Sequence, residues 1–191
     1  MNVLIYCGSR SGNNSDYEQA ARNVGTLIAN NGWGLVYGGG SVGLMGIVAQ
    51  AALDGGANVI GVIPTFLATD EVSMKSCTEL IEVPSMHARK LLMIERSDVI
   101  VALPGAYGTM DELFEAVTWL QLDLHSKPIG VLNVNGFYDS LEQQFDRMTQ
   151  DGFLTEANRR LIVIDKDPDR LLQHLTRRAA TGVSRQLENR S

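Results

Sequence analysis

The stretch from Asp98 to Val117 constrains the fold more than any other part of this 191-residue sequence. It opens with a short apolar run, residues 99–103, which is rich in β-branched side chains and typical of a buried parallel strand. From Met110 onward, apolar residues recur with the spacing of a helix that has one apolar stripe. The turn between them, residues 104–109, is mostly small. A strand that turns directly into a helix points free backbone N–H groups and the positive end of the helix dipole at one spot. The stretch therefore predicts an anion-binding turn, most often a phosphate site, at the end of a strand.

The rest of the chain alternates strands with helices. Strands are predicted at residues 2–7, 33–37, 58–63, 78–83, 99–103, 128–133 and 161–164. Helices are predicted at residues 15–30, 44–53, 85–96, 137–150 and 167–178, together with the one that begins at Met110. This rhythm predicts an α/β fold, a doubly wound parallel sheet flanked by helices, in one domain over residues 1–178. Residues 65–76 have no clear period and are interpreted as a long functional loop or a short lid, and residues 179–191 as a polar, loose tail.

The charge balance argues against a nucleic acid or a membrane surface as a partner. Sixteen Lys+Arg against 22 Asp+Glu give a net charge of −6, and no basic cluster offsets it. The two cysteines, Cys7 and Cys77, lie far apart without metal or redox spacing, and we expect them to be reduced. The N-terminus opens directly into a strand, without the pattern of a signal peptide, and no run approaches the ~18 apolar residues of a membrane span. We therefore expect a cytoplasmic protein.

Three of the predicted strands end in glycine-rich turns, which follow Cys7, Tyr37 and Leu103. The carboxyl ends of parallel strands share one edge of the sheet, where α/β proteins bind ligands, so the three turns together predict a phosphorylated ligand. The first turn lacks the G-x-G-x-x-G spacing of a dinucleotide site, the second follows the wrong strand, and no Gly-Lys-Ser/Thr marks a P-loop. A mononucleotide or a sugar phosphate remains. The candidate ligand-binding residues of the first two turns are Gly8, Ser9, Gly39 and Gly40.

The helix predicted at residues 85–96 places Met86, Arg89, Lys90 and Met93 on one face. A solvated surface is the ordinary interpretation of Arg and Lys on an exposed helix. The two methionines on the same stripe favour a functional interpretation, in which an apolar shelf for a base is flanked by two cations near an anionic ligand.

Glu112 has two interpretations that the sequence leaves equally open. Thr109 to Glu112 match a capping box, in which a Glu at the third helical position bonds the backbone N–H of the cap residue. The alternative is a catalytic carboxylate beside the anion-binding turn. The three histidines, His87, His125 and His174, show no metal spacing, and no metal site is predicted.

Three motifs follow one another along the chain. They are Gly38-Gly39-Gly40-Ser41-Val42-Gly43-Leu44-Met45-Gly46, then Ser-Met-His-x-Arg-Lys from Ser85, then Pro-Gly-x-x-Gly-Thr-x-x-Glu from Pro104. Together they resemble the Lonely Guy family of cytokinin riboside 5′-monophosphate phosphoribohydrolases, long mislabelled as lysine decarboxylases, and the similarity runs from Val3 to roughly Phe153. The resemblance implies a Rossmann-like fold, at least a dimer, and a site near the subunit interface. It also implies hydrolysis of the N-glycosidic bond of a cytokinin riboside 5′-monophosphate or AMP to a free base and ribose 5-phosphate, without a metal or other cofactor.

Matching motif positions carries the family's site onto this chain. The resemblance implies that Arg89 and Glu112 form the catalytic pair. The substrate-binding positions that it implies are Glu71, Lys90, Gly105, Ala106, Tyr107, Gly108, Thr109 and Thr118, with Met86 beside them. Ala106 stands where the family usually has the second glycine of Pro-Gly-Gly. If that position needs a positive φ or a very close phosphate, the methyl group has a cost, and we expect altered affinity rather than lost activity.

Two other functions compete with this one. A non-catalytic carrier of a nucleotide or of molybdenum cofactor, built on the same fold, would need neither Arg89 nor Glu112, so the presence of both favours the enzyme. A lysine decarboxylase would need a pyridoxal phosphate-binding lysine in a much larger chain, and none of the four lysines lies in a recognisable cofactor motif.

Overall fold

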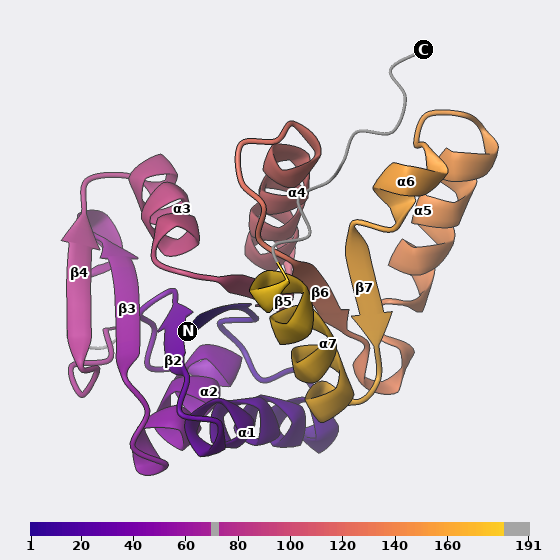
Figure 1. Ribbon diagram of the computed structural model, residues 1–191. Coiled ribbons are helices and arrows are strands. Elements are labelled where there is room, and N and C mark those ends of the chain that lie inside the picture. The colour runs from indigo at the N-terminus through magenta and orange to yellow at the C-terminus, as the bar shows by residue number, and fades with distance from the viewer. Residues whose placement is uncertain (70–72, 182–191) are drawn as a thin grey trace.

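One parallel sheet of seven strands organises the chain, in the order β4-β3-β2-β1-β5-β6-β7 (Figure 1). This computed structural model describes residues 1–69 and 73–181. The strands are β1 Asn2–Tyr6, β2 Gly34–Tyr37, β3 Val59–Pro64, β4 Glu79–Val83, β5 Val99–Ala102, β6 Ile129–Leu132 and β7 Ile162–Asp165. Each pair of neighbouring strands is parallel. The central strands are apolar throughout because helices bury both of their faces.

Helices cover both faces of the sheet (Figure 1). The helices are α1 Ser15–Asn30, α2 Gly43–Asp54, α3 Met86–Glu95, α4 Tyr107–Gln121, α5 Asp139–Gln150, α6 Glu156–Arg159 and α7 Pro168–Ala180, with 3-10 turns η1 Thr65–Leu67 and η2 Val134–Gly136. The apolar stripes of α1, α2 and α7 pack into one core cluster, and those of α3, α4 and α5 pack into a second cluster on the opposite face. Among the described residues, no helix is both long and apolar enough to cross a membrane.

The direction of winding reverses at β1. From β1 the chain adds β2, β3 and β4 on one side, and then returns to place β5, β6 and β7 on the other. The loops that follow β1 and β5 therefore lead away from each other at the carboxyl edge of the sheet. Such a switch point is the place where a doubly wound sheet leaves a crevice for a ligand.

The predicted doubly wound sheet is confirmed, with its strands and longer helices in the predicted order. Three predicted helix boundaries are wrong by two or three residues: α4 begins at Tyr107 rather than Met110, α5 begins at Asp139 rather than Phe137, and α7 continues past Arg178 to Ala180. Helix α6 and the two 3-10 turns are too short to carry an apolar period and escape prediction. The predicted loop at residues 65–76 begins with η1, while residues 70–72 of that loop and residues 182–191 of the predicted tail lie outside the described residues.

Candidate active site

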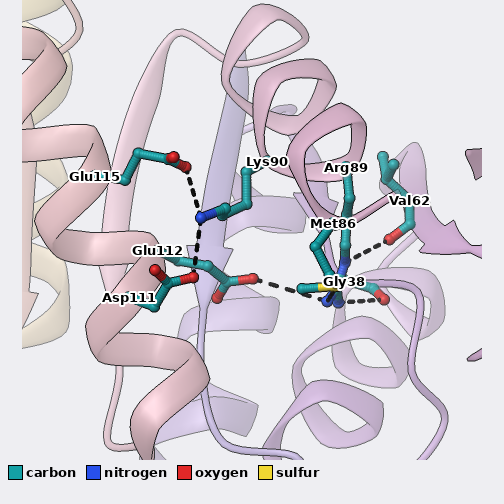
Figure 2. Close-up of polar contacts among 8 residues, drawn as sticks. All are labelled: Gly38, Val62, Met86, Arg89, Lys90, Asp111, Glu112 and Glu115. Carbon is teal, nitrogen blue, oxygen red and sulfur yellow. Dashed lines mark hydrogen bonds and ion pairs between the residues drawn. The ribbon is translucent and has the colours of Figure 1, made fainter. Parts of the chain in front are cut away.

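The carboxyl edge of the sheet carries a cavity of about 240 Å³, which we call the main cavity. Its walls come from the ends of β1, β2 and β3, from η1, from α3, from the first turn of α2 and from the first two turns of α4. The lining residues are Cys7, Gly8, Ser9, Gly38, Gly40, Val42, Met45, Ile63, Leu67, Met86, Arg89, Ala106, Gly108, Thr109 and Glu112. The charged residues among them, Arg89 on α3 and Glu112 on α4, face each other (Figure 2).

Main-chain oxygens hold Arg89 in place. Its Nε donates a hydrogen bond to the carbonyl of Val62 in β3 (3.0 Å), and its Nη2 donates to the carbonyl of Gly38 after β2 (2.8 Å). Position 38 has no room for a side chain, because a Cβ there would stand 2.0 Å from Nη2. The residue is 7% exposed, and its Nη1 lies 4.0 Å from Oε1 of Glu112. A buried cation is thus fixed beside a buried carboxylate.

Glu112 is a buried carboxylate in the second turn of α4 and not a capping residue. Because α4 begins at Tyr107, its third position is Thr109, so the capping-box interpretation is wrong. Glu112 is 4% exposed. Burial raises the pKa of its carboxyl group from 4.5 to about 7, against the opposing effect of the Arg89 charge, and the nearby charge of Asp111 raises it further. A carboxyl group with a pKa near 7 is suited to general acid–base work at neutral pH.

Lys90 points toward α4 and not into the main cavity (Figure 2). Its Nζ lies 3.0 Å from Oδ2 of Asp111 and 3.0 Å from Oε2 of Glu115. Burial lowers the pKa of the Lys90 ammonium group, but the two carboxylates outweigh burial, and the pKa is raised overall. In this geometry Lys90 joins α3 to α4, which supports the pairing of Arg89 with Glu112. Its predicted contact with the substrate stays a prediction.

The amino end of α4 offers uncapped backbone N–H groups to the main cavity. Its N-cap residue, Ala106, forms no side-chain cap, whereas α1, α3, α6 and α7 each have a capping side chain. The first N–H groups of a helix have no partner inside the helix, and the helix dipole is positive at this end. Ala106, Gly108 and Thr109 all line the cavity. The predicted anion-binding turn therefore opens into the space that Arg89 and Glu112 share.

Gly105 and Ala106 differ in what their positions require. A Cβ at Gly105 would stand 2.0 Å from Oγ1 of Thr109 and 2.9 Å from the backbone N of Gly8, so this position requires glycine. Ala106 has φ −102° and ψ −151°, an extended conformation that any residue adopts without strain. The methyl group of Ala106 therefore costs no backbone strain, and the predicted change in affinity depends on the space that it occupies in the cavity wall.

The candidate residues of the two other glycine-rich turns differ in whether they line the main cavity. Gly8, Ser9 and Gly40 line the main cavity, and Gly39 does not. Gly39 has a φ of +74°, and its carbonyl accepts a hydrogen bond from the backbone N–H of Met74 (2.9 Å). A left-handed φ favours glycine, so Gly39 shapes the turn that brings its neighbours to the cavity.

The remaining predicted substrate-binding residues lie away from the main cavity or outside the described residues. Tyr107 is 93% exposed at the start of α4. Thr118 is exposed on a later turn of α4, where its hydroxyl donates to the carbonyl of Phe114 (2.7 Å). Glu71 lies in the part of the chain that is not described. Binding by these three residues stays a prediction.

The apolar wall of the main cavity is what sequence reasoning misses. Its residues are Val42, Met45, Ile63 and Leu67, with Cys7 and Gly38 beside them. Met45 belongs to the quoted glycine-rich motif and could have been paired with Met86, whereas Ile63 and Leu67 reach the cavity only because β3 lies beside β2. Within residues 1–69 and 73–181, no group of three or more His, Cys, Asp or Glu side chains could hold a metal ion.

Comparison with known proteins gives consistent matches. A family model described as "Possible lysine decarboxylase" matches residues 45–175, more than half of the chain. Cytokinin riboside 5′-monophosphate phosphoribohydrolase LOG2 of Arabidopsis thaliana is 47% identical over 173 residues, which cover 91% of this chain and 81% of that protein. The probable cytokinin riboside 5′-monophosphate phosphoribohydrolase LOGL1 of Oryza sativa subsp. japonica is 46% identical, over 91% of this chain and 78% of that protein.

Solved structures with the same fold are more distant in sequence. The Moco carrier protein from Chlamydomonas reinhardtii matches with a TM-score of 0.70 and 21% identity, over 94% of this chain and 98% of that chain. The molybdenum cofactor binding protein from Rippkaea orientalis matches with a TM-score of 0.68 and 21% identity, over 92% of this chain and 95% of that chain. At this level of identity the likeness shows a shared fold.

Proposed function

Because the chain belongs to the Lonely Guy family of cytokinin riboside 5′-monophosphate phosphoribohydrolases, we propose that it hydrolyses the N-glycosidic bond of cytokinin riboside 5′-monophosphates, of AMP, or of both. The products are a free base and ribose 5-phosphate. The observation that carries the proposal is the juxtaposition in one cavity of a buried acid, a buried cation and an uncapped helix start.

We assign the parts of the nucleotide by their chemistry. The phosphate belongs at the start of α4, where the uncapped N–H groups face the main cavity. The ribose then reaches Glu112, one turn further along the same helix. The base belongs against the apolar wall, which includes Met45, and Met86 lines the same cavity. Binding of the phosphate at this place positions the ribose for reaction.

The reaction breaks the bond between C1′ of the ribose and a ring nitrogen of the base. Positive charge builds on the sugar as this bond lengthens, as in glycoside hydrolysis. The ionised Glu112 stabilises that charge and accepts a proton from the attacking water, whose oxygen forms the new bond to C1′. The bonding electrons leave with the base, which takes up a proton. A guanidinium group is a poor proton donor, so we assign Arg89 the work of orienting groups and stabilising negative charge.

A panel of nucleotides tests this function. We expect ribose 5-phosphate release from AMP, from isopentenyladenosine monophosphate, or from both. We expect much slower base release from adenosine, because adenosine lacks the 5′-phosphate that positions the ribose. If no nucleoside monophosphate yields ribose 5-phosphate, the proposal is wrong.

The carrier alternative has weaker support. Its support is the fold shared with proteins of 21% identity, whereas Arg89 and Glu112 lie in one cavity as an enzyme requires. Nucleotide recovered unchanged after long incubation with the protein would favour the carrier. A lysine decarboxylase is disfavoured by the cavity itself, because no lysine occurs among the described residues that line it.

We also propose a homodimer or larger assembly in the cytoplasm. Exposed apolar side chains lie on α3, on α4 and just after α4: Leu91, Phe114, Leu122 and Leu124. Since α3 and α4 also carry Arg89 and Glu112, an interface over them would lie near the site. The free thiols of Cys7 and Cys77 suit a reducing compartment. Light scattering should give a multiple of the 20.8 kDa chain mass, and a value of 20.8 kDa would contradict the assembly.

A further inference from the structure

A second cavity of about 300 Å³ adjoins the main one at the carboxyl edge of the sheet, and we call it the second cavity. Its walls come from the loop after β1, the starts of α1 and α2, the loop after β5 and the segment before α5. The lining residues are Gly8, Ser9, Arg10, Ser11, Gly12, Tyr17, Leu44, Pro104, Gly105, Ala106 and Phe137. It thus lies over β1 and β5, at the switch point of the sheet.

The two cavities share a low wall of small residues. Gly8, Ser9 and Ala106 line both. At this wall the backbone N–H of Gly8 donates to the carbonyl of Pro104 (3.0 Å). The other two shared residues, Ser9 and Ala106, are exposed. A ligand held on this wall can therefore extend into both cavities.

Arg10 supplies the only charge among the described residues that line the second cavity. No ion pair or side-chain hydrogen bond of Arg10 occurs in the described part of the chain, although the protein as a whole carries a net charge of −6. Its backbone is closely supported, because a Cβ at Gly43 would stand 2.5 Å from the backbone N of Arg10. An unpaired guanidinium group on a supported loop is well suited to bind a phosphate through paired hydrogen bonds.

Two aromatic rings also line the second cavity. Tyr17 of α1 meets Phe137 edge to face, with ring centroids 5.8 Å apart. A hydrogen bond from the Asn135 side chain to Asp16 (2.6 Å) ties the same two segments together. The second cavity therefore combines one cation with an apolar, aromatic side.

We propose that the second cavity is a subsite for a second phosphate, so that the site binds nucleotides that carry a 5′-pyrophosphate group as well as monophosphates. This inference rests on the proposed function, which assigns the first phosphate to the start of α4 beside the shared wall. A phosphate attached to the first one crosses that wall and meets Arg10. A group attached beyond the second phosphate, such as the distal ribose of ADP-ribose, lies against Tyr17 and Phe137.

Inhibition of AMP hydrolysis tests the subsite. The readout is ribose 5-phosphate, which AMP yields and ADP cannot yield by the same reaction. We expect ADP and ADP-ribose to compete with AMP, each with an inhibition constant no higher than the KM for AMP. Competition by ADP alone would support a subsite that ends at Arg10. Competition by ADP-ribose alone, or by neither, would overturn the proposal, because the second phosphate would then not be recognised.

Arg10→Ala makes the test specific to this residue. We expect the ratio of the ADP inhibition constant to the KM for AMP to rise about tenfold, the effect of one lost charge-assisted hydrogen bond. Arg22→Ala is the matched control, because it removes an equal charge from the exposed surface of α1 and should leave the ratio unchanged. An unchanged ratio in Arg10→Ala, or an equal rise in Arg22→Ala, would contradict the subsite. If the wild type hydrolyses no AMP, calorimetry gives the ratio of the dissociation constants of ADP and AMP, for which we expect the same change. Failure of the proposed function is therefore distinguishable from failure of the subsite.

Discussion

Glu112→Gln is expected to lower the rate of base release from AMP by about a thousandfold, within the range for a lost general acid or base. Glutamine keeps the size of the side chain but can neither accept a proton nor offset positive charge on the ribose. Free adenine and ribose 5-phosphate measure the loss. A rate within tenfold of the wild type would show that Glu112 is not the catalytic carboxylate.

The variant should stay folded, and the raised pKa of Glu112 predicts how the stability of the wild type and of the variant changes with pH. Burial raises the pKa of Glu112 from 4.5 in its ordinary state to about 7 in the folded protein. Between these two pH values the folded state keeps a proton that the unfolded state has lost. The free energy of unfolding therefore falls as pH rises through this window and levels off above about 7. Glutamine is neutral throughout, so the melting temperature should fall less between pH 5 and pH 8 in the variant than in the wild type. An equal fall in both proteins would refute the raised pKa.

The same pKa predicts the pH dependence of catalysis by the wild type. If the ionised carboxylate reacts, kcat/KM rises with pH up to about 7 and then levels off, as the free enzyme loses the proton from Glu112. A kcat/KM that falls as pH rises through 7 would instead make the neutral acid the reactive form, as a proton donor to the departing base.

Arg89→Ala is expected to lower the rate of base release by about 10²- to 10³-fold, the effect of losing one electrostatic donor in an active site. The substitution also leaves the carbonyls of Val62 and Gly38 without their donors, which costs about 1–3 kcal/mol for each buried group. We therefore expect a folded protein with a lower melting temperature. Because the Arg89 charge lowers the pKa of Glu112, the rise of kcat/KM should move to higher pH in the variant. If kcat/KM rises at the same pH in the variant as in the wild type, the Arg89 charge does not influence the ionisation of Glu112.

Gly38→Ala tests the same point with Arg89 still present. A Cβ at position 38 would stand 2.0 Å from Nη2 of Arg89, so the guanidinium group must move. We expect a rate loss close to that of Arg89→Ala. Arg89→Lys adds a second comparison, since it keeps the charge but cannot bond both carbonyls and face Glu112 at once. Full activity in Gly38→Ala would show that the position of the cation is unimportant.

The sheet and the turn between β5 and α4 could be predicted because their signals are local. The apolar run at residues 99–103 and the small residues after it depend on chain neighbours alone. The start of α4 could not be placed from the same stretch, because Ala106 stands at the N-cap position without a capping side chain. Misplacing that start by one turn is what made Glu112 fit a capping box.

The pairing of side chains between α3 and α4 could be predicted only in part. The motifs name Arg89, Lys90 and Glu112 as site residues, but they do not show which cation meets which acid. Adjacent positions on a helix point about 100° apart, so Arg89 faces the main cavity while Lys90 faces Asp111 and Glu115. The acceptor role of Gly38 leaves no sequence signal, because every residue has a carbonyl.

The anchoring of Arg89 by backbone carbonyls has an evolutionary consequence. Val62 and Gly38 hold the guanidinium through atoms that substitution does not alter, so long as position 38 stays free of a side chain. The apolar residues of the wall to which we assign the base, such as Met45 and Leu67, take no part in that anchoring. Substitutions at those positions can change which base is accepted while Arg89 and Glu112 keep their relative positions. The selectivity for the base can therefore evolve separately from the residues proposed for catalysis.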